Sequence, residues 1–218
     1  MGSGGGTPTP GSSAALRRRA AAELGALALL AALYLALVPE RPAGVDAALA
    51  GLALAAVGLT ARATRARFWA GPAAPARGWT AALLGASLAV ALGFAALGAR
   101  SAGPARLLAP TVGLTFLLFL PWAWLQQALL QFYLLGRVRA LLPGARPLAP
   151  AAVNGALFAA VHLPDGELAA LTWLAGFVWS RYYLACRRLG PLALSHALLG
   201  TAYFAGVRGE DLLARWLA

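Results

Sequence analysis

The chain carries little charge, one cysteine, two histidines and no lysine among its 218 residues. Charged residues make up 11% of the sequence, whereas a soluble domain typically contains about 25%. The single cysteine, Cys186, excludes an intrachain disulfide and a metal centre built from cysteines. Hydrophobic residues make up 61% of the chain, and the mean hydropathy is +0.71. A soluble fold of this length could not bury so much apolar surface, so the composition predicts an integral membrane protein of the all-α class.

The basic residues are of one kind. All 18 of them are arginine, and the formal net charge is +11. A nucleic-acid-binding protein would gather these charges on one polar face, with aromatic residues between them. Here the arginines occupy short segments between apolar runs, as the positive-inside rule describes. We therefore expect the lipid bilayer, and no nucleic acid, as a partner of this chain.

The apolar runs predict a polytopic transmembrane helical bundle of about seven spans. Pro121 predicts a kink in the fourth span, about one turn before a group of glutamines. The sequence divides into a disordered N-terminal tail over 1–15, N-terminal transmembrane helices over 16–106, a core over 107–207 and an interfacial C-terminal helix over 208–218. The predicted spans are residues 20–38, 45–61, 80–99, 107–136, 149–163, 167–186 and 191–207.

The arginine-rich segments all fall on one side of this predicted bundle. They precede the first span and follow the second, fourth and sixth. Arginine-rich loops stay in the cytoplasm, and arginine without lysine, amid so much alanine, indicates a GC-rich bacterial genome. The sequence therefore predicts a multi-pass protein of a bacterial inner membrane with its N-terminus in the cytoplasm. The acidic residues collect on the opposite side: Glu40, Asp46, Asp165, Glu167, Glu210 and Asp211.

A few polar residues interrupt the apolar spans. Such residues are costly at membrane depth and usually face the interior of a bundle or a wet cavity, so they are candidates for a functional site. Helical spacing places Asn154, Phe158 and His162 on one face of the fifth span, and His196 with Gly200 on one face of the seventh. The fourth span carries Gln126, Gln127 and Gln131. Three spans therefore offer polar groups to a common cavity, with Asn154, Phe158 and Gly200 expected in its wall.

The order of these motifs resembles the CPBP family of intramembrane proteases, the relatives of type II CAAX prenyl endopeptidases. That family carries Glu-Glu-x-x-x-Arg, Phe-x-x-x-His and His-x-x-x-Asn on successive helices. Here the second motif is intact from Phe158 to His162, and the third keeps His196 but has Gly200 in place of asparagine. The first keeps its spacing as three glutamines. The resemblance covers about residues 110–205 and implies a CPBP-like core within 107–207.

The resemblance also implies an activity. In the family, the first glutamate is taken to activate a water molecule that attacks the scissile amide, while the histidines orient this water or stabilise the oxyanion. It therefore implies a membrane-anchored peptide or protein substrate. The family label has sometimes implied a metal, but the sequence contains no complete metal site, so we expect no cofactor and assign no metal ligands. A glutamine forms hydrogen bonds but cannot accept a proton; a histidine could itself act as the base near neutral pH, which is the least strained route to a working hydrolase. The implied catalytic residues are Gln126, Gln127, Gln131, His162 and His196.

The sequence leaves other functions open. An inactive family member, or pseudoprotease, would bind a membrane segment or a lipidated tail without cutting it, and a small transporter would use the same polar cavity. Two histidines could also hold a haem or supply half of a zinc site, although no third metal ligand lies near them in the sequence. Hydrogen bonding between helices, which contributes about 0.6 kcal/mol, explains each polar residue taken alone. Only the joint pattern favours the protease-like site.

Overall fold

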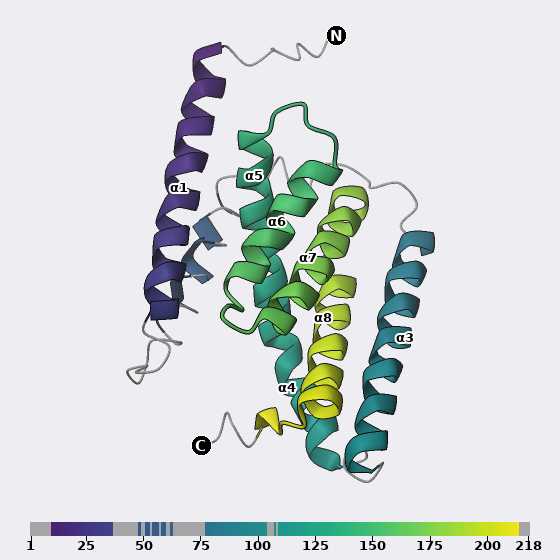
Figure 1. Ribbon diagram of the computed structural model, residues 1–218. Coiled ribbons are helices and arrows are strands. Elements are labelled where there is room, and N and C mark those ends of the chain that lie inside the picture. Colours follow the sequence, from purple (N-terminus) through teal and green to yellow (C-terminus); the bar gives the residue numbers. More distant parts are fainter. Residues whose placement is uncertain are drawn as a thin grey trace. The chain divides into compact units, whose positions relative to one another are not determined.

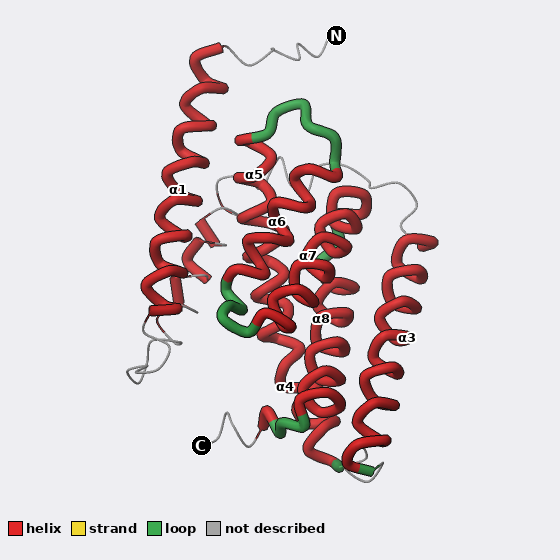
Figure 2. Tube along the Cα trace, in the orientation of Figure 1, coloured by secondary structure: helices red, strands yellow, loops and turns green. Residues whose placement is uncertain are grey.

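The computed structural model describes residues 10–36, 48, 51–52, 54–56, 58–59, 62, 77–103, 107 and 109–213. These residues form helices joined by turns, and none of them lies in a strand (Figure 2). The predicted all-α class is therefore confirmed. The chain divides into two compact units, each built from segments that are distant in sequence. Unit 1 comprises residues 1–52 and 130–181, and unit 2 comprises residues 53–129 and 182–218.

Two helices are long and apolar enough to cross a membrane. One extends over 25 residues, Arg77–Ser101, and the other over 32 residues, Pro110–Leu141; about 20 residues span the hydrocarbon layer. They correspond to the third and fourth predicted spans. Helices also occupy the positions of the first, fifth, sixth and seventh predicted spans, whereas the second, 45–61, lies mostly outside the described residues.

Unit 1 contains α1 (Pro10–Ala36), α5 (Leu135–Leu141), α6 (Leu148–Ala160) and most of α7 (Gly166–Cys186). In Figure 1, α1 lies beside α5, and these two helices are in contact. Helices α6 and α7 approach closely at glycines. A Cβ atom added to Gly155 would lie 2.7 Å from the backbone oxygen of Trp173, and one added to Gly176 would lie 3.0 Å from Cα of Gly155. Both positions therefore require the absence of a side chain.

Unit 2 contains α3 (Arg77–Ala102), α4 (Pro110–Gln127), α8 (Gly190–Ala202) and a π-helical segment, η4 (Tyr203–Arg208). Helix α8 packs against both α3 and α4 (Figure 1). A buried apolar cluster formed by Phe119, Ala123 and Ala197 joins α4 to α8. The hydroxyl groups of Ser87 and Ser195, 2.7 Å apart, form a buried hydrogen bond between α3 and α8. These contacts fix the face of α8 that carries His196.

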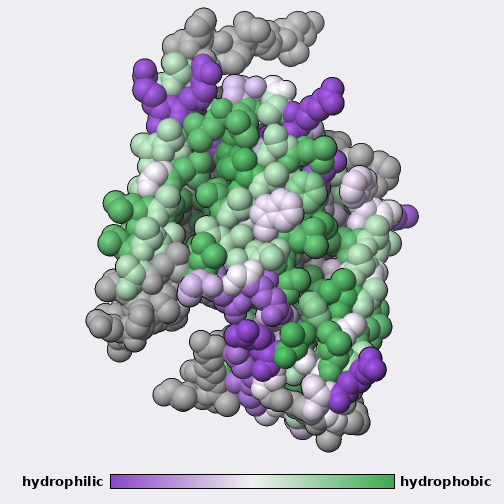
Figure 3. Space-filling view, in the orientation of Figure 1, coloured by the Kyte–Doolittle hydropathy of each residue, from purple (hydrophilic) through white to green (hydrophobic). Residues whose placement is uncertain are grey.

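Large apolar side chains are exposed along the long helices. Much of the surface in Figure 3 is hydrophobic, and the strongly hydrophilic residues form separate patches on it. Exposed leucines and valines of this kind lie on both candidate spans, as a surface in contact with lipid tails requires. On α3 and α4 they are Leu88, Val90, Leu92, Leu97, Leu114, Leu117 and Leu118.

The structure differs from the sequence-based expectations at the start of the first helix. Helix α1 begins at Pro10, inside the segment 1–15 that was expected to be disordered. Pro121 lies within α4, and the helix continues beyond it, as expected of the fourth predicted span, into a second π-helical segment, η3 (Ala128–Leu134), and then into α5. The kink at Pro121 stays a prediction. The expected C-terminal helix is described only as far as Leu213. The division of the chain at residues 106 and 207 stays a prediction.

Candidate functional site

Gln127 and His196 meet inside unit 2. Gln127 is the last residue of α4 and is 0% exposed, and His196 lies in the middle of α8 and is 8% exposed. The amide Nε2 of Gln127 is 3.4 Å from Nδ1 of the His196 ring. The structure therefore joins the first and third motifs through a buried contact between an uncharged amide and an imidazole.

An aromatic side chain packs against the same histidine. The rings of Phe119 and His196 are in an edge-to-face arrangement, with their centroids 5.6 Å apart. One turn along α8, a Cβ atom added to Gly200 would lie 2.5 Å from Cε1 of Phe119. Gly200 is the position at which the resemblance would place an asparagine, so in this chain the ring of Phe119 occupies the space for that side chain.

His162 is held by its own motif in unit 1. It lies in the turn after α6, and its Nδ1 donates a hydrogen bond of 2.8 Å to the backbone oxygen of Phe158. The two rings are also in contact, with centroids 4.8 Å apart. Phe158 is buried and packs against Trp179 of α7, with a centroid separation of 5.8 Å. The Phe-x-x-x-His spacing thus produces one compact element in which a core aromatic residue orients the histidine.

Asn154 connects three segments of unit 1. Its side chain is 0% exposed, and Nδ2 donates to the backbone oxygen of Leu130 at 3.1 Å and to Oγ of Ser180 at 2.9 Å. Ser180 Oγ in turn donates to the backbone oxygen of Gly176 at 2.7 Å. The oxygen Oδ1 of Asn154 has no hydrogen-bond partner among the described residues. Asn154 therefore links η3, α6 and α7 through buried hydrogen bonds. Its predicted place in the wall of a substrate cavity stays a prediction.

The other two glutamines differ in burial. Gln131 is 0% exposed within η3. Gln126 is partly buried, and its Oε1 has no hydrogen-bond partner within the described part of the chain. The predicted site residues are thus distributed over both units: Gln126, Gln127, His196 and Gly200 belong to unit 2, whereas Gln131, Asn154, Phe158 and His162 belong to unit 1. The convergence of all of them on one cavity stays a prediction.

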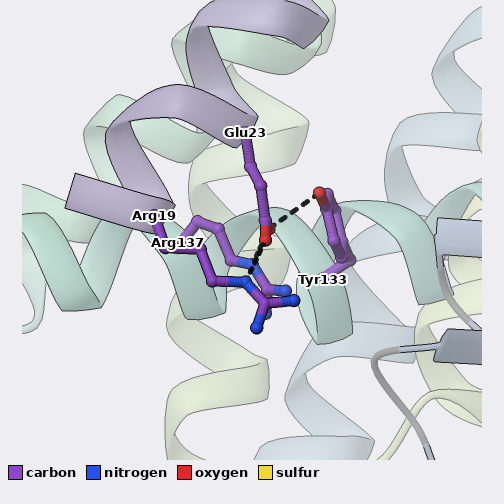
Figure 4. A network of polar contacts seen from close by, with 4 residues as sticks. All are labelled: Arg19, Glu23, Tyr133 and Arg137. Atoms are coloured by element: carbon purple, nitrogen blue, oxygen red, sulfur yellow. Dashed lines mark hydrogen bonds and ion pairs between the residues drawn. The ribbon is translucent and has the colours of Figure 1, made fainter. Parts of the chain in front are cut away.

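Unit 1 also contains a network of charged residues that was not predicted from the sequence. Glu23 of α1 accepts hydrogen bonds from Nε of Arg137 at 2.6 Å, from the hydroxyl of Tyr133 at 3.0 Å and from Nε of Arg19 at 2.7 Å (Figure 4). The guanidinium carbon of Arg137 also lies 4.4 Å from the centre of the Tyr133 ring. Each half of the network has the four-residue spacing of neighbours on a helix, a signal that was readable in the sequence. The pairing of Arg19 and Glu23 with Tyr133 and Arg137 could not be read from the sequence.

The acidic residues near the histidine motif have local roles. Asp165 caps the start of α7, because its Oδ1 accepts a hydrogen bond from the backbone N–H of Leu168 at 3.0 Å. Glu167 lies in the first turn of α7, where a negative charge is favourable. Over the described residues, no group of three histidine, cysteine, aspartate or glutamate side chains is arranged to hold a metal ion.

Comparison with known proteins identifies the core. Residues 107–202 match the family model of the type II CAAX prenyl endopeptidases, described as Rce1-like. Over the core of the chain, this match confirms the resemblance drawn from the three motifs, to a membrane-embedded family of the CAAX-protease type. The matched segment contains all three glutamines and both histidines. No curated protein and no solved structure matches the chain.

Proposed function

We propose that this chain is an intramembrane peptidase of the CAAX-endopeptidase type that uses His162, in place of a glutamate, as its base. The hydrogen bond from His162 to the backbone oxygen of Phe158 carries this proposal. A carbonyl oxygen can only accept, so Nδ1 of His162 carries the proton. In the neutral ring, Nε2 then keeps its lone pair and can accept a proton from water. The position of the proton is set by the backbone of the intact Phe-x-x-x-His motif.

The proposed reaction is the hydrolysis of a peptide bond near a membrane anchor. Nε2 of His162 takes a proton from a water molecule while the water oxygen forms a bond to the carbonyl carbon of the substrate. The C–N bond then breaks, and the same proton passes to the leaving amine. None of the three glutamines can replace the histidine in this step, because an amide accepts no proton at physiological pH. That both histidines and the glutamines serve one site is part of the proposal, and the order of their motifs in the family supports it.

A second function is supported by the packing around His196. The ring of Phe119 fills the space beside Gly200, and His196 is almost fully buried. Such packing favours a pseudoprotease that binds a membrane-anchored or lipidated segment without hydrolysing it. The two functions differ in one observable property, since only the peptidase releases a cleaved product.

The test uses the purified full-length protein in lipid nanodiscs and a library of membrane-anchored peptides, with and without a lipid tail. Cleavage products are detected by mass spectrometry for the wild type, His162→Ala, His196→Ala, Gln126→Glu and Gln127→Glu. Val161→Ala is the matched control, because Val161 is an exposed neighbour of His162. The proposal expects cleavage by the wild type and by the control, and a loss of about 10²–10⁴-fold in His162→Ala.

Other results select against the proposal. Cleavage that is equally fast in His162→Ala would exclude His162 as the base. If the wild type binds peptides without cutting them, and Gln126→Glu or Gln127→Glu gains cleavage, the chain is the pseudoprotease. The Gln126→Glu and Gln127→Glu variants therefore also show whether the rest of the family's catalytic arrangement is preserved.

A further inference from the structure

The buried contact between Gln127 and His196 determines where the proton of the histidine lies. The atom of Gln127 that faces Nδ1 of His196 is the amide nitrogen Nε2, at 3.4 Å. An amide nitrogen can donate a hydrogen bond but cannot accept one. Nδ1 must therefore be the acceptor, so the proton of the neutral imidazole lies on Nε2.

Burial makes this choice of tautomer strict. Gln127 is 0% exposed and His196 is 8% exposed, so both side chains are largely shielded from bulk water. A proton on Nδ1 would place two N–H groups against each other, and two donors that face one another are disfavoured. The amide of Gln127 therefore stabilises one tautomer of His196 over the other.

The ring is held in position from other directions as well. Phe119 packs edge-to-face against it, and the adjacent residue Ser195 is hydrogen-bonded to Ser87 of α3. These contacts restrict rotation of the imidazole about its side-chain bonds and sliding of α8 against α3. Gln127 thus selects the tautomer of His196, while Phe119 and Ser195 restrict the orientation of the His196 ring.

We infer that Gln127 is a positioning residue that fixes His196 as the Nε2–H tautomer, and thereby as a hydrogen-bond donor to a carbonyl oxygen or oxyanion. His162 has the opposite tautomer, since its Nδ1 donates to the backbone oxygen of Phe158. One histidine is thus arranged as an acceptor and the other as a donor. That the donor meets the substrate carbonyl rests on the proposed function, whereas the tautomer of His196 does not.

The test is ¹⁵N NMR of the full-length protein labelled at histidine, recorded in detergent micelles at a pH where both rings are neutral. The chain contains only two histidines, so His162→Ala assigns the spectrum. We expect a protonated Nε2 and an unprotonated Nδ1 for His196, and the reverse for His162, which serves as an internal reference. In Gln127→Glu the proton of His196 should move to Nδ1, because a carboxylate only accepts.

Two further variants separate positioning from packing. Gln127→Leu removes the amide and should give His196 a mixture of tautomers, whereas Leu118→Ala, on the exposed surface of α4, should leave the spectrum unchanged. A wild-type His196 with its proton on Nδ1, or an unchanged tautomer in Gln127→Leu, would overturn the inference. Because the measurement uses no substrate, this result is independent of whether the protein cleaves peptides.

Discussion

Phe119 and Gly200 are matched to each other across α4 and α8. The ring of Phe119 is buried, and a single carbon atom added to Gly200 would come within 2.5 Å of it. The ring also packs on His196. The glycine of the third motif is therefore one half of a packing pair, and the asparagine of the family cannot simply be placed back at this position.

We predict that Gly200→Asn destabilises the protein by about 1–3 kcal/mol, because the new side chain overpacks a filled site. Adding Phe119→Leu to Gly200→Asn should recover a large part of this loss. The free energy of unfolding is measured by denaturant titration in detergent micelles, followed by tryptophan fluorescence. Gly113→Ala on α4 is the control, since an added Cβ atom there meets nothing within 4 Å. A Gly200→Asn variant as stable as the control would show that the ring moves freely.

The Glu23 network gives a second prediction. Glu23→Gln should cost about 1–3 kcal/mol of stability, because hydrogen bonds to a charged group are lost where both charged partners are largely buried. The side chains of Glu23 and Arg137 are 22% and 17% exposed. Arg19→Gln is the contrasting variant: the side chain of Arg19 is 72% exposed, so its loss should change stability little. Equal effects of Arg19→Gln and Arg137→Gln in the same titration would contradict the stronger role of Arg137.

Asn154 is predicted to stabilise unit 1 through both hydrogens of its amide. Asn154→Ala should reduce the free energy of unfolding by about 1–3 kcal/mol, since the buried backbone oxygen of Leu130 and the hydroxyl of Ser180 both lose their donor. Ser180→Ala should cost less, because the bond from Asn154 to Leu130 is retained. The same unfolding titration orders the two variants, and a larger loss in Ser180→Ala would contradict the predicted ranking.

If His162 is the base, the direction of the pH dependence of cleavage follows. Protonation of the ring at Nε2 removes the lone pair that accepts the proton of water, so kcat/KM should fall as the pH is lowered and reach a plateau at higher pH. The profile is measured from about pH 5 to 9. Residual cleavage in His162→Ala should lack this acidic limb, whereas an identical limb in that variant would assign it to another group.

The sequence predicted the helices better than their interactions. Apolar runs bounded by proline, glycine and arginine placed the fifth and sixth spans at 149–163 and 167–186, and the structure has α6 at Leu148–Ala160 and α7 at Gly166–Cys186. The end of α6 was placed too late: Leu163 continues the apolar run but lies in the turn, since a residue before a proline is disfavoured in a helix. The π-helical segments were not predictable, because no residue pattern distinguishes their hydrogen bonding from that of an α-helix.

The candidate site could be predicted from the sequence only in part. Helical spacing correctly joined Phe158 to His162, which are neighbours along one helix face and remain in contact. The contact between Gln127 and His196 joins residues 69 positions apart, and the family resemblance, rather than local spacing, led to it. The filling of the space at Gly200 by Phe119 depends on the packing of two helices, which the one-dimensional pattern does not contain.

The ion pair between Glu23 and Arg137 has a consequence for how the protein is made. The two residues are 114 positions apart, and synthesis proceeds from the N-terminus. Glu23 therefore leaves the ribosome long before Arg137 exists. During this interval Arg19, one helical turn away, is the member of the final network that can neutralise the carboxylate. The exposed arginine that contributes little to the finished fold is thus the early partner of Glu23, and it becomes secondary only after α5 has been added.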